Sequence, residues 1–341
     1  MTELGKVDRE FFDESIYPHL GSDRDDISVK PQHGVDFGVI DVGEHAIAMA
    51  TDPVFIMPSL GFERAAWFTF HILIADVAVS GLPPSHLSVD FNLPPEITND
   101  EFATIWRTFD REAVNLDVGI VTGHTARYAG CNYPMVGGAT SIAVGDPEAL
   151  IVPTGAQVGN RVLITKGPAI EATGLLAIQF ASLLDELDPE ILTAAQDRFY
   201  DMSPVNDAMV AADIGGVTAM HDATEGGVYG GLHELARNAD VKLEIVRDRI
   251  PIMDGVLETC NSFDIDPWQS ISEGTLLMTV QPGVVDSILD ALDDHGIPAA
   301  DIGSVERGSG VYFDGKPVTP PERDPFWAAF ESGLERMEGA E

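Results

Sequence analysis

Met220-His221-Asp222-Ala223-Thr224-Glu225-Gly226-Gly227 combines an imidazole, two carboxylates and a glycine pair in eight positions. An apolar run at 214–219 precedes it and an amphipathic pattern at 228–237 follows, which predicts strand, acidic loop and helix. Carboxylates hold a divalent cation and the free N–H groups of a helix start attract an anion, so the order suits a metal-bound phosphate. The alternative is that Asp222 or Thr224 merely caps the helix, with the glycines giving room for the turn.

Length and charge restrict the class of protein. The chain has 341 residues, more than one ordinary core accommodates, so we expect two domains, 1–150 and 151–341. Its 56 acidic residues outnumber 19 basic ones, for a formal net charge of -37 spread along the chain. Nucleic-acid binding needs a basic patch and is not expected. The acidic excess instead predicts a halophilic protein, in which salt screens the self-repulsion.

The cysteines and the apolar segments predict a soluble cytoplasmic protein without a membrane partner. Cys131 and Cys260 have no metal-ligand spacing and form no disulfide framework, so we expect each to be a core residue in a reducing compartment. The N-terminus is charged and lacks an apolar signal core. The most apolar helix pattern, at 65–81, contains His71 and Asp76 and is too short and polar to span a bilayer.

Strand and helix patterns alternate throughout, which predicts an α/β (α+β) fold. In the first half, strands are expected at 37–41, 46–51, 87–91, 118–121 and 136–144, and helices at 65–80 and 100–115. In the second half, strands are expected at 161–165, 242–246, 276–280 and 300–305, and helices at 171–187, 189–199, 204–213 and 228–237. The Pro- and Gly-rich stretch 146–160 is the predicted domain boundary.

Three aspartates of the first half suggest a metal site. Asp36 follows Gly34 closely, Asp52 ends an apolar strand, and Asp76 lies inside the apolar helix. An unpaired carboxylate inside such a helix costs several kcal/mol, and a divalent cation with carboxylate and water ligands would offset that cost. The alternative is that Asp76 hydrogen-bonds to backbone or to an arginine.

A second phosphate-binding candidate lies at 120–128. We expect a strand that ends in Thr122-Gly123, followed by His124, Thr125 and Arg127. This order offers backbone N–H groups, hydroxyls and a cation to a polyphosphate. The alternative is an ordinary glycine turn with a solvated arginine. It is not a Walker loop, because the sequence contains no Gly-Lys-Ser or Gly-Lys-Thr.

Taken in order, the motifs resemble the AIR synthase-related superfamily, which includes AIR synthase, thiamine-monophosphate kinase, selenophosphate synthetase and the hydrogenase maturation factor HypE. The matching segments are Gly34-Val35-Asp36, Ala50-Thr51-Asp52-Pro53, the stretch from Ala75 to Pro83, the stretch from Met220 to Gly227 (called the opening stretch below) and Ser272-Glu273-Gly274-Thr275. The last two are most similar to HypE-type sequences, so the chain looks like a HypE-like protein from a halophile.

The resemblance implies a two-domain fold and a homodimer that binds ATP and magnesium. The N-terminal domains of two copies would form a shared β-barrel, and each C-terminal α/β domain would pack against its own half. The implied magnesium ligands are Asp36, Asp52, Asp76 and Asp222. The implied nucleotide-binding residues are Gly34, Thr51, Gly123, Thr125, Arg127, Gly226 and Gly227. The implied catalytic residues are Asp76, His124, Glu225 and Glu273.

Two departures from the family pattern bear on activity. His124 stands where other members carry an acidic residue, so it would contact a phosphate or act as an acid or base instead. HypE ends in a cysteine that carries a carbamoyl group, whereas the last residues here, 337–341, contain none, so we expect no reaction on the chain's own tail.

The function expected from the resemblance is ATP-dependent activation of an unidentified acceptor by phosphoryl transfer, with a possible protein partner. The alternatives are a small-molecule kinase like thiamine-monophosphate kinase and a non-catalytic nucleotide-binding maturation factor.

Overall fold

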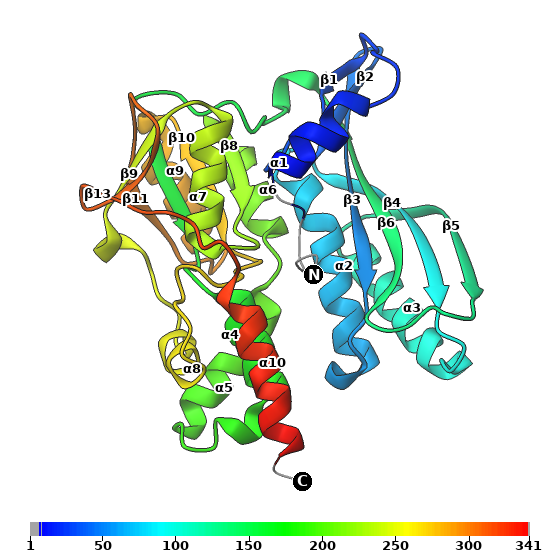
Figure 1. Cartoon of the computed structure of the whole chain (residues 1–341). Helices are drawn as coiled ribbons and strands as arrows, with labels where there is room; N and C mark the ends of the chain where they lie inside the picture. The colour runs from blue at the N-terminus through cyan, green and yellow to red at the C-terminus, as the bar shows by residue number, and fades with distance from the viewer. Residues whose placement is uncertain (1–6, 8, 340–341) are drawn as a thin grey trace.

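The computed structural model describes residue 7 and residues 9–339. Two β-sheets lie on either side of helix α2 (Phe62–Ala78), as Figure 1 shows. The first sheet has the order β1-β2-β3-β6-β4-β5, so β1 and β5 form its edges. Its strands are β1 (Ile27–Val29), β2 (Gly38–Val42), β3 (His45–Phe55), β4 (Pro84–Leu93), β5 (Gly119–Arg127) and β6 (Met135–Gly145). All neighbours pair antiparallel except β4 and β5, which are parallel.

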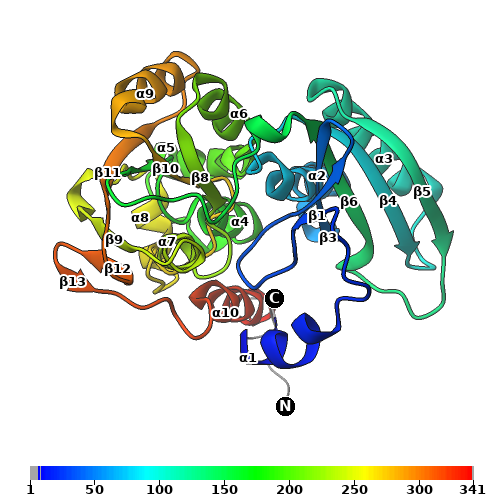
Figure 2. The same cartoon turned by 90° about the horizontal axis from the view of Figure 1, so that it is seen from above.

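The second sheet has the order β13-β12-β9-β11-β7-β10-β8. Its strands are β7 (Arg161–Thr165), β8 (Val217–Asp222), β9 (Lys242–Ile245), β10 (Leu276–Val280), β11 (Ala299–Glu306), β12 (Gly310–Phe313) and β13 (Lys316–Pro317). Strand β10 is buried along its whole length, because helices cover both faces of this sheet (Figure 2). Strand β10 lies between β7 and the edge strand β8, and the turn before it lies at the interface between the two halves of the chain.

The described residues form nine further α-helices besides α2. They are α1 (Arg9–Phe11), α3 (Asn99–Asn115), α4 (Ile170–Gln179), α5 (Pro189–Asp197), α6 (Val205–Ile214), α7 (Gly227–Asn238), α8 (Val256–Ser262), α9 (Val285–Asp294) and α10 (Pro325–Glu338). Helix α3 starts with a capping box, in which Thr98 Oγ1 accepts from the Glu101 N–H and Glu101 accepts from the Thr98 N–H. Helices α2 and α3 cover one face of the first sheet.

Helix α2 belongs to the cores of both halves. One side packs on β3 and β6, and another packs against α6 and the 3-10 turn at Arg198–Asp201. The rings of Trp67 and Phe68 lie 5.6 and 6.1 Å from that of Phe199, and all these contacts fall in one continuous apolar cluster. Burial on two sides explains why the α2 sequence is so apolar.

The predicted two-domain α/β fold is confirmed, and most predicted elements lie within a few residues of the observed ones. The strand expected at 118–121 continues to Arg127, so the motif at 122–127 lies in a strand and not in a loop after one. The helix expected at 171–187 ends at Gln179, where Phe180 turns inward against Phe263 and Phe330. Strands β1, β12 and β13 and helices α1, α8, α9 and α10 were not predicted.

Three smaller expectations can also be compared with the structure. Cys260 is buried as predicted, but Cys131 lies half-buried in a turn after β5, so the prediction of a core cysteine there is wrong. Within the described residues, no helix is long and apolar enough to cross a membrane. The stretch 146–160 connects β6 to β7 without a strand, and the domain limits at 150 and 151 stay a prediction.

Candidate metal and nucleotide site

Five acidic residues from both halves define what we call the acidic cluster: Asp52, Asp76, Glu171, Asp222 and Glu273. Asp222 ends β8, and Glu273 lies in the turn just before β10, which pairs with β8. The register places Leu276 opposite Asp222, and the Ala223 N–H donates to Thr275 O at 2.9 Å. The pairing of two strands therefore brings together Asp222 and Glu273, which lie 51 residues apart in sequence.

Glu273 lies at the centre of the acidic cluster. Its side chain is 3% exposed, and its Oε1 has no hydrogen-bond partner among the described residues. Burial, with the negative charges of the other four cluster members, raises its pKa well above the usual range. Asp52 and Asp76 contribute to this shift from the first half of the chain, so the cluster spans the interface between the halves.

Glu171 was not predicted from the sequence. It lies in the first turn of α4, and its Oε2 accepts a hydrogen bond from the Glu273 N–H at 3.2 Å. Burial and the charges of Asp324, Glu225 and Asp222 raise the pKa of Glu171 to about 8, although the Glu273 N–H opposes this shift. One sequence feature could have indicated Glu171 as a site residue. Gly167-Pro168 lies between an apolar strand and a helix that starts with an acidic residue, an order similar to the strand, acidic loop and helix around 220–227.

His221 joins the two halves beside this cluster. Its Nδ1 lies 2.6 Å from Asp36 Oδ2 and its Nε2 lies 2.6 Å from Glu234 Oε2 on α7. Burial disfavours the imidazolium, but the two carboxylates outweigh it and raise the pKa of His221 well above its usual value. Asn238 adds a second contact, because its Nδ2 donates to Gly34 O at 2.6 Å. The Gly34–Asp36 segment is thereby fixed on the C-terminal half.

The oxygens of the acidic cluster fit a hard divalent cation better than the imidazole does. Asp36, His221 and Asp222 each offer a ligand atom, and these atoms lie within 4.8 Å of one another. Both nitrogens of His221, however, already contact carboxylates, so an imidazolium there cannot coordinate. Asp222 and Glu273 are buried and the other three members are half-buried, so these mutually repelling carboxylates need protons or a cation. Carboxylate oxygens are the ligands that Mg²⁺ and Ca²⁺ prefer.

The glycines of the opening stretch shape the start of α7. Gly226 and Gly227 have φ of 77° and 58°, and a Cβ on Gly227 would come 2.4 Å from Ser270 O. The Gly226 N–H donates to Asp324 Oδ2 at 2.7 Å, so this helix start binds a carboxylate of its own chain. Burial, together with the charge of Glu225, raises the pKa of Asp324 to about 6, against the effect of three backbone N–H donors. Neither Asp222 nor Thr224 caps the helix.

The β5 motif lies away from the acidic cluster within one chain. Strands β6 and β4 separate β5 from β3, which at ~4.8 Å per strand puts β5 about 14 Å from the strand of Asp52. His124 Nε2 lies 2.8 Å from Tyr128 Oη, and Arg127 donates to Ile97 O and Asn99 Oδ1 at the start of α3. Gly123 fits closely against β4, where a Cβ would come 2.3 Å from Val89 O. Thr125 is exposed.

The remaining predicted residues lie nearer the acidic cluster. Thr51 precedes Asp52 on β3 but points to the opposite, uncovered face, where its Oγ1 lies 2.9 Å from Thr140 Oγ1. Gly34 has a φ of 77° and lies against Glu234, where an added Cβ would meet the Glu234 Cγ at 3.0 Å. Glu225 is half-buried and electrostatically coupled to Glu171 and Asp324.

Two family sequence models match this chain. The N-terminal domain of AIR synthase related proteins matches residues 34–145, and the C-terminal domain matches residues 157–316. The chain belongs to the AIR synthase-related proteins. The two matched regions contain strands β2 to β6 of the first sheet, strands β7 to β12 of the second and, between them, all five members of the acidic cluster.

Several known proteins resemble this AIR synthase-related protein. Carbamoyl dehydratase HypE of Bradyrhizobium diazoefficiens is 26% identical over 290 residues, which are 79% of this chain and 77% of the relative. A crystal structure of E. coli HypE is 23% identical with a TM-score of 0.71, covering 92% of this chain and 96% of that one. A hydrogenase maturation protein HypE in complex with ATP is 21% identical with a TM-score of 0.67, covering 93% of each. At these identities, the solved structures establish the shared fold.

Proposed function

We propose that this AIR synthase-related protein is a HypE-like, ATP-dependent enzyme that activates an acceptor by phosphoryl transfer from Mg-ATP. The observation that carries the proposal is the environment of Glu273, a buried carboxylate among four others at the interface between the halves. A cluster of this charge is costly without a cation, and a chain this acidic can attract a polyphosphate only through a metal. The complex of a HypE with ATP, on the same fold, supports the choice of nucleotide.

Asp52, Asp76 and Asp222 would hold the magnesium, because they bring carboxylate oxygens from β3, α2 and β8 to one place. Bound magnesium neutralises phosphate charge and orients the transferring group. Asp36 would contribute only through the oxygen that does not contact His221. The pKa of Glu171 is raised to about 8, so this residue can hold a proton near neutral pH, which suits exchange of a proton with the acceptor. The pKa of Glu273 is raised in the same direction.

We infer that strand β5 completes the nucleotide site on a second copy of the chain. β5 is an edge strand with exposed residues on both faces, including Val121 at 56%, and an exposed apolar edge favours pairing with another chain. In a homodimer with a shared barrel, Gly123, His124, Thr125 and Arg127 would approach phosphates held by the partner's acidic cluster. Gly226 and Gly227 would then shape the acceptor side of the site, since Asp324 occupies the Gly226 N–H.

Thermal unfolding in high-salt buffer tests nucleotide binding. The unfolding temperature is expected to rise with ATP or ADP plus magnesium, and less with either component alone, because a ligand that binds only the folded state stabilises it by mass action. The matched control is Asp290→Asn, which removes an exposed carboxylate on α9 and should leave the rise intact. No rise for the unaltered protein would contradict the proposal.

Turnover separates the proposal from its alternatives. Incubation with γ-labelled ATP and cell extract, followed by mass spectrometry, should reveal an acceptor whose presence provokes ATP hydrolysis. Stable transfer of the label to thiamine monophosphate would identify a small-molecule kinase. Binding of Mg-ATP without hydrolysis in any acceptor pool would identify a non-catalytic nucleotide-binding factor.

A further inference from the structure

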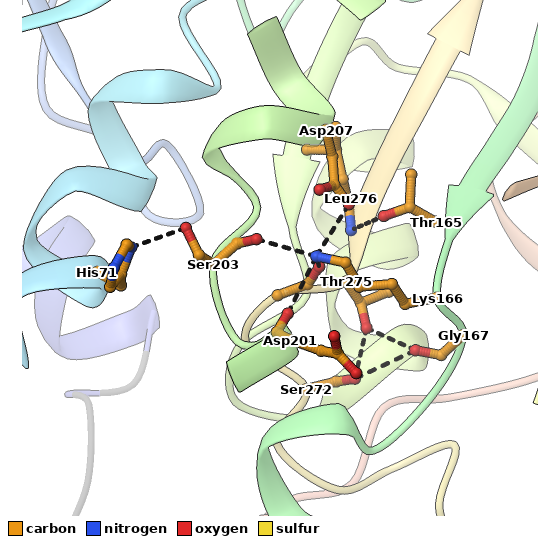
Figure 3. Close-up of polar contacts among 11 residues, drawn as sticks. His71, Thr165, Lys166, Gly167, Asp201, Ser203, Asp207, Ser272, Thr275 and Leu276 are labelled. Carbon is orange, nitrogen blue, oxygen red and sulfur yellow. Dashed lines mark hydrogen bonds and ion pairs between the residues drawn. The ribbon is translucent and has the colours of Figure 1, made fainter. Parts of the chain in front are cut away.

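Lys166 is a buried lysine directly behind the acidic cluster. It directly follows β7, and the residue is 6% exposed. Its Nζ donates to three backbone carbonyls, Asp201 O at 3.0 Å, Ser203 O at 2.9 Å and Gly274 O at 3.0 Å (Figure 3). It also forms an ion pair with Asp207 Oδ1 at 3.0 Å. One ammonium group therefore joins three segments of the chain, which offsets the cost of burying the charge.

The turn that presents Glu273 is fixed by the segment around Lys166. Thr275 Oγ1 donates to Gly167 O at 2.5 Å, and the Leu276 N–H donates to Thr165 Oγ1 at 3.0 Å. Gly274 has a φ of 96°, and a Cβ there would come 2.2 Å from Asp201 O. Only glycine allows this approach, which brings the Gly274 carbonyl onto the ammonium. The position of Glu273 thus depends on the contact between its neighbour and Lys166.

The same ammonium is connected to helix α2 of the first half. Ser203, whose carbonyl binds Lys166, places its Oγ 2.9 Å from His71 Nδ1 on α2 (Figure 3). The ring of His71 packs on Trp67 with centroids 4.2 Å apart, and its Nε2 lies 3.5 Å from Glu112 Oε2 on α3. His71 precedes Asp76 by five residues on the same rigid helix. The contacts therefore run from the Glu273 turn to the helix that carries Asp76.

The local backbone supports a specific role for this lysine. Lys166 has a φ of 59°, a left-handed conformation that a lysine rarely adopts. Its carboxylate partner, Asp207, is 1% exposed and lies in the first turn of α6. Strained, fully buried polar arrangements of this kind persist where the surrounding structure holds them, and they gather at functional sites.

We propose that Lys166 is a positioning residue that sets the turn of Glu273 relative to Asp76, and so fixes the geometry of the acidic cluster across the interface between the two halves. The proposal rests on the proposed function, because it assigns Lys166 to the assembly of the Mg-ATP site. Lys166 touches neither nucleotide nor acceptor, and acts through the Gly274 carbonyl on one side and through Ser203 and His71 on the other.

The test compares Lys166→Met with Lys242→Met. The control removes a lysine of β9 that contacts Glu244 and Glu306 near the surface. Affinity for Mg-ATP is measured by calorimetry at a temperature where each variant is folded, and the unfolding temperature is measured without ligand. Lys166→Met is expected to weaken Mg-ATP binding by at least about tenfold, as loss of a supporting contact does at metal sites. Lys242→Met should bind like the unaltered protein.

A role in stability alone predicts a lower unfolding temperature with unchanged affinity for Mg-ATP, and that result would overturn the proposal. If Lys166→Met does not fold, the affinity of Ser203→Ala for Mg-ATP tests the proposal instead, because this change removes only the hydroxyl that contacts His71. It should weaken Mg-ATP binding by about threefold, and unchanged affinity would again overturn the proposal. Absence of Mg-ATP binding by the unaltered protein would instead count against the proposed function.

Discussion

The acidic cluster and strand β5 are both candidates for phosphate binding, but they differ in how complete they are within one chain. The acidic cluster combines buried and half-buried residues of β3, α2, α4, β8 and the turn before β10 at the interface between the two halves. Strand β5 presents His124, Thr125 and Arg127 at an exposed sheet edge. One chain therefore contains the cation-binding part of the proposed site, whereas in the proposed homodimer the β5 part would come from the second copy.

The largest effect is expected from Asp76→Asn. Removal of a charged ligand should lower ATP-dependent turnover by at least about a hundredfold, since electrostatic stabilisation of the transferring phosphate is lost. The unfolding temperature without metal should stay the same or rise, because the change removes one of several repelling charges. Turnover assays and thermal unfolding measure the two quantities. Full turnover in Asp76→Asn would show that the acidic cluster takes no part in the reaction.

The next effect concerns the contribution of β5. His124→Ala should weaken turnover by about ten- to a hundredfold if the imidazole contacts a phosphate, the range for a hydrogen bond to a charged group. In an equal mixture of His124→Ala and Asp76→Asn chains that exchange subunits, half of the dimers combine both variants. Each of those dimers would contain one intact site, so about a quarter of the original activity should return. Failure of mixed dimers to regain activity would place His124 outside the partner's site.

A smaller effect is expected from pH. The pKa of Glu171 is raised to about 8 in the folded protein, from 4.5 without the fold. The folded state therefore binds the Glu171 proton more tightly than the unfolded state does. The resulting stabilisation of the folded protein is complete below pH 4.5 and is lost as the pH rises through about 8. Magnesium can replace the proton, so the rise in unfolding temperature with magnesium should be larger at pH 8.5 than at pH 6. Equal rises at both pH values would show that Glu171 is not coupled to the cation.

The smallest effect is expected from Arg127→Ala. In the single chain, Arg127 contacts Ile97 O and Asn99 Oδ1, and their loss should lower the free energy of unfolding by about 1 kcal/mol. Denaturant unfolding measures this change, and Mg-ATP calorimetry on the same variant separates a structural role from phosphate binding. Lost affinity for Mg-ATP with no loss of stability would mean that Arg127 leaves α3 when the nucleotide binds.

Motif spacing located much of the acidic cluster, but the roles of individual residues depended on contacts that are distant in sequence. Asp52, Asp76, Asp222 and Glu273 were all predicted as site residues. Glu171 was missed, because its importance comes from the pairing of β7 with β10, which places its helix start against Glu273.

His221 shows the same limit. Its position in the opening stretch favoured a chemical role for the imidazole. In the structure, however, its two nitrogens contact Asp36, from 185 residues earlier in the chain, and Glu234 on α7. Gly226 was expected to offer its N–H to a phosphate, and Asp324 accepts that hydrogen bond instead. No local pattern reports such partners, since each is brought near by packing of elements that are distant in sequence.

Sequence alone established the alternating α/β elements, the ordered family motifs and the excess of carboxylates, because periodicity, motif order and composition are present before the chain folds. With so many carboxylates, phosphate chemistry requires a cation. Only the packing of distant elements determined that five buried and half-buried carboxylates share one site, that Lys166 supports the turn of Glu273, and that β5 lies outside the site. The physical reason is that electrostatic coupling depends on distance and burial, and both are fixed only when β8, β10 and α2 pack together.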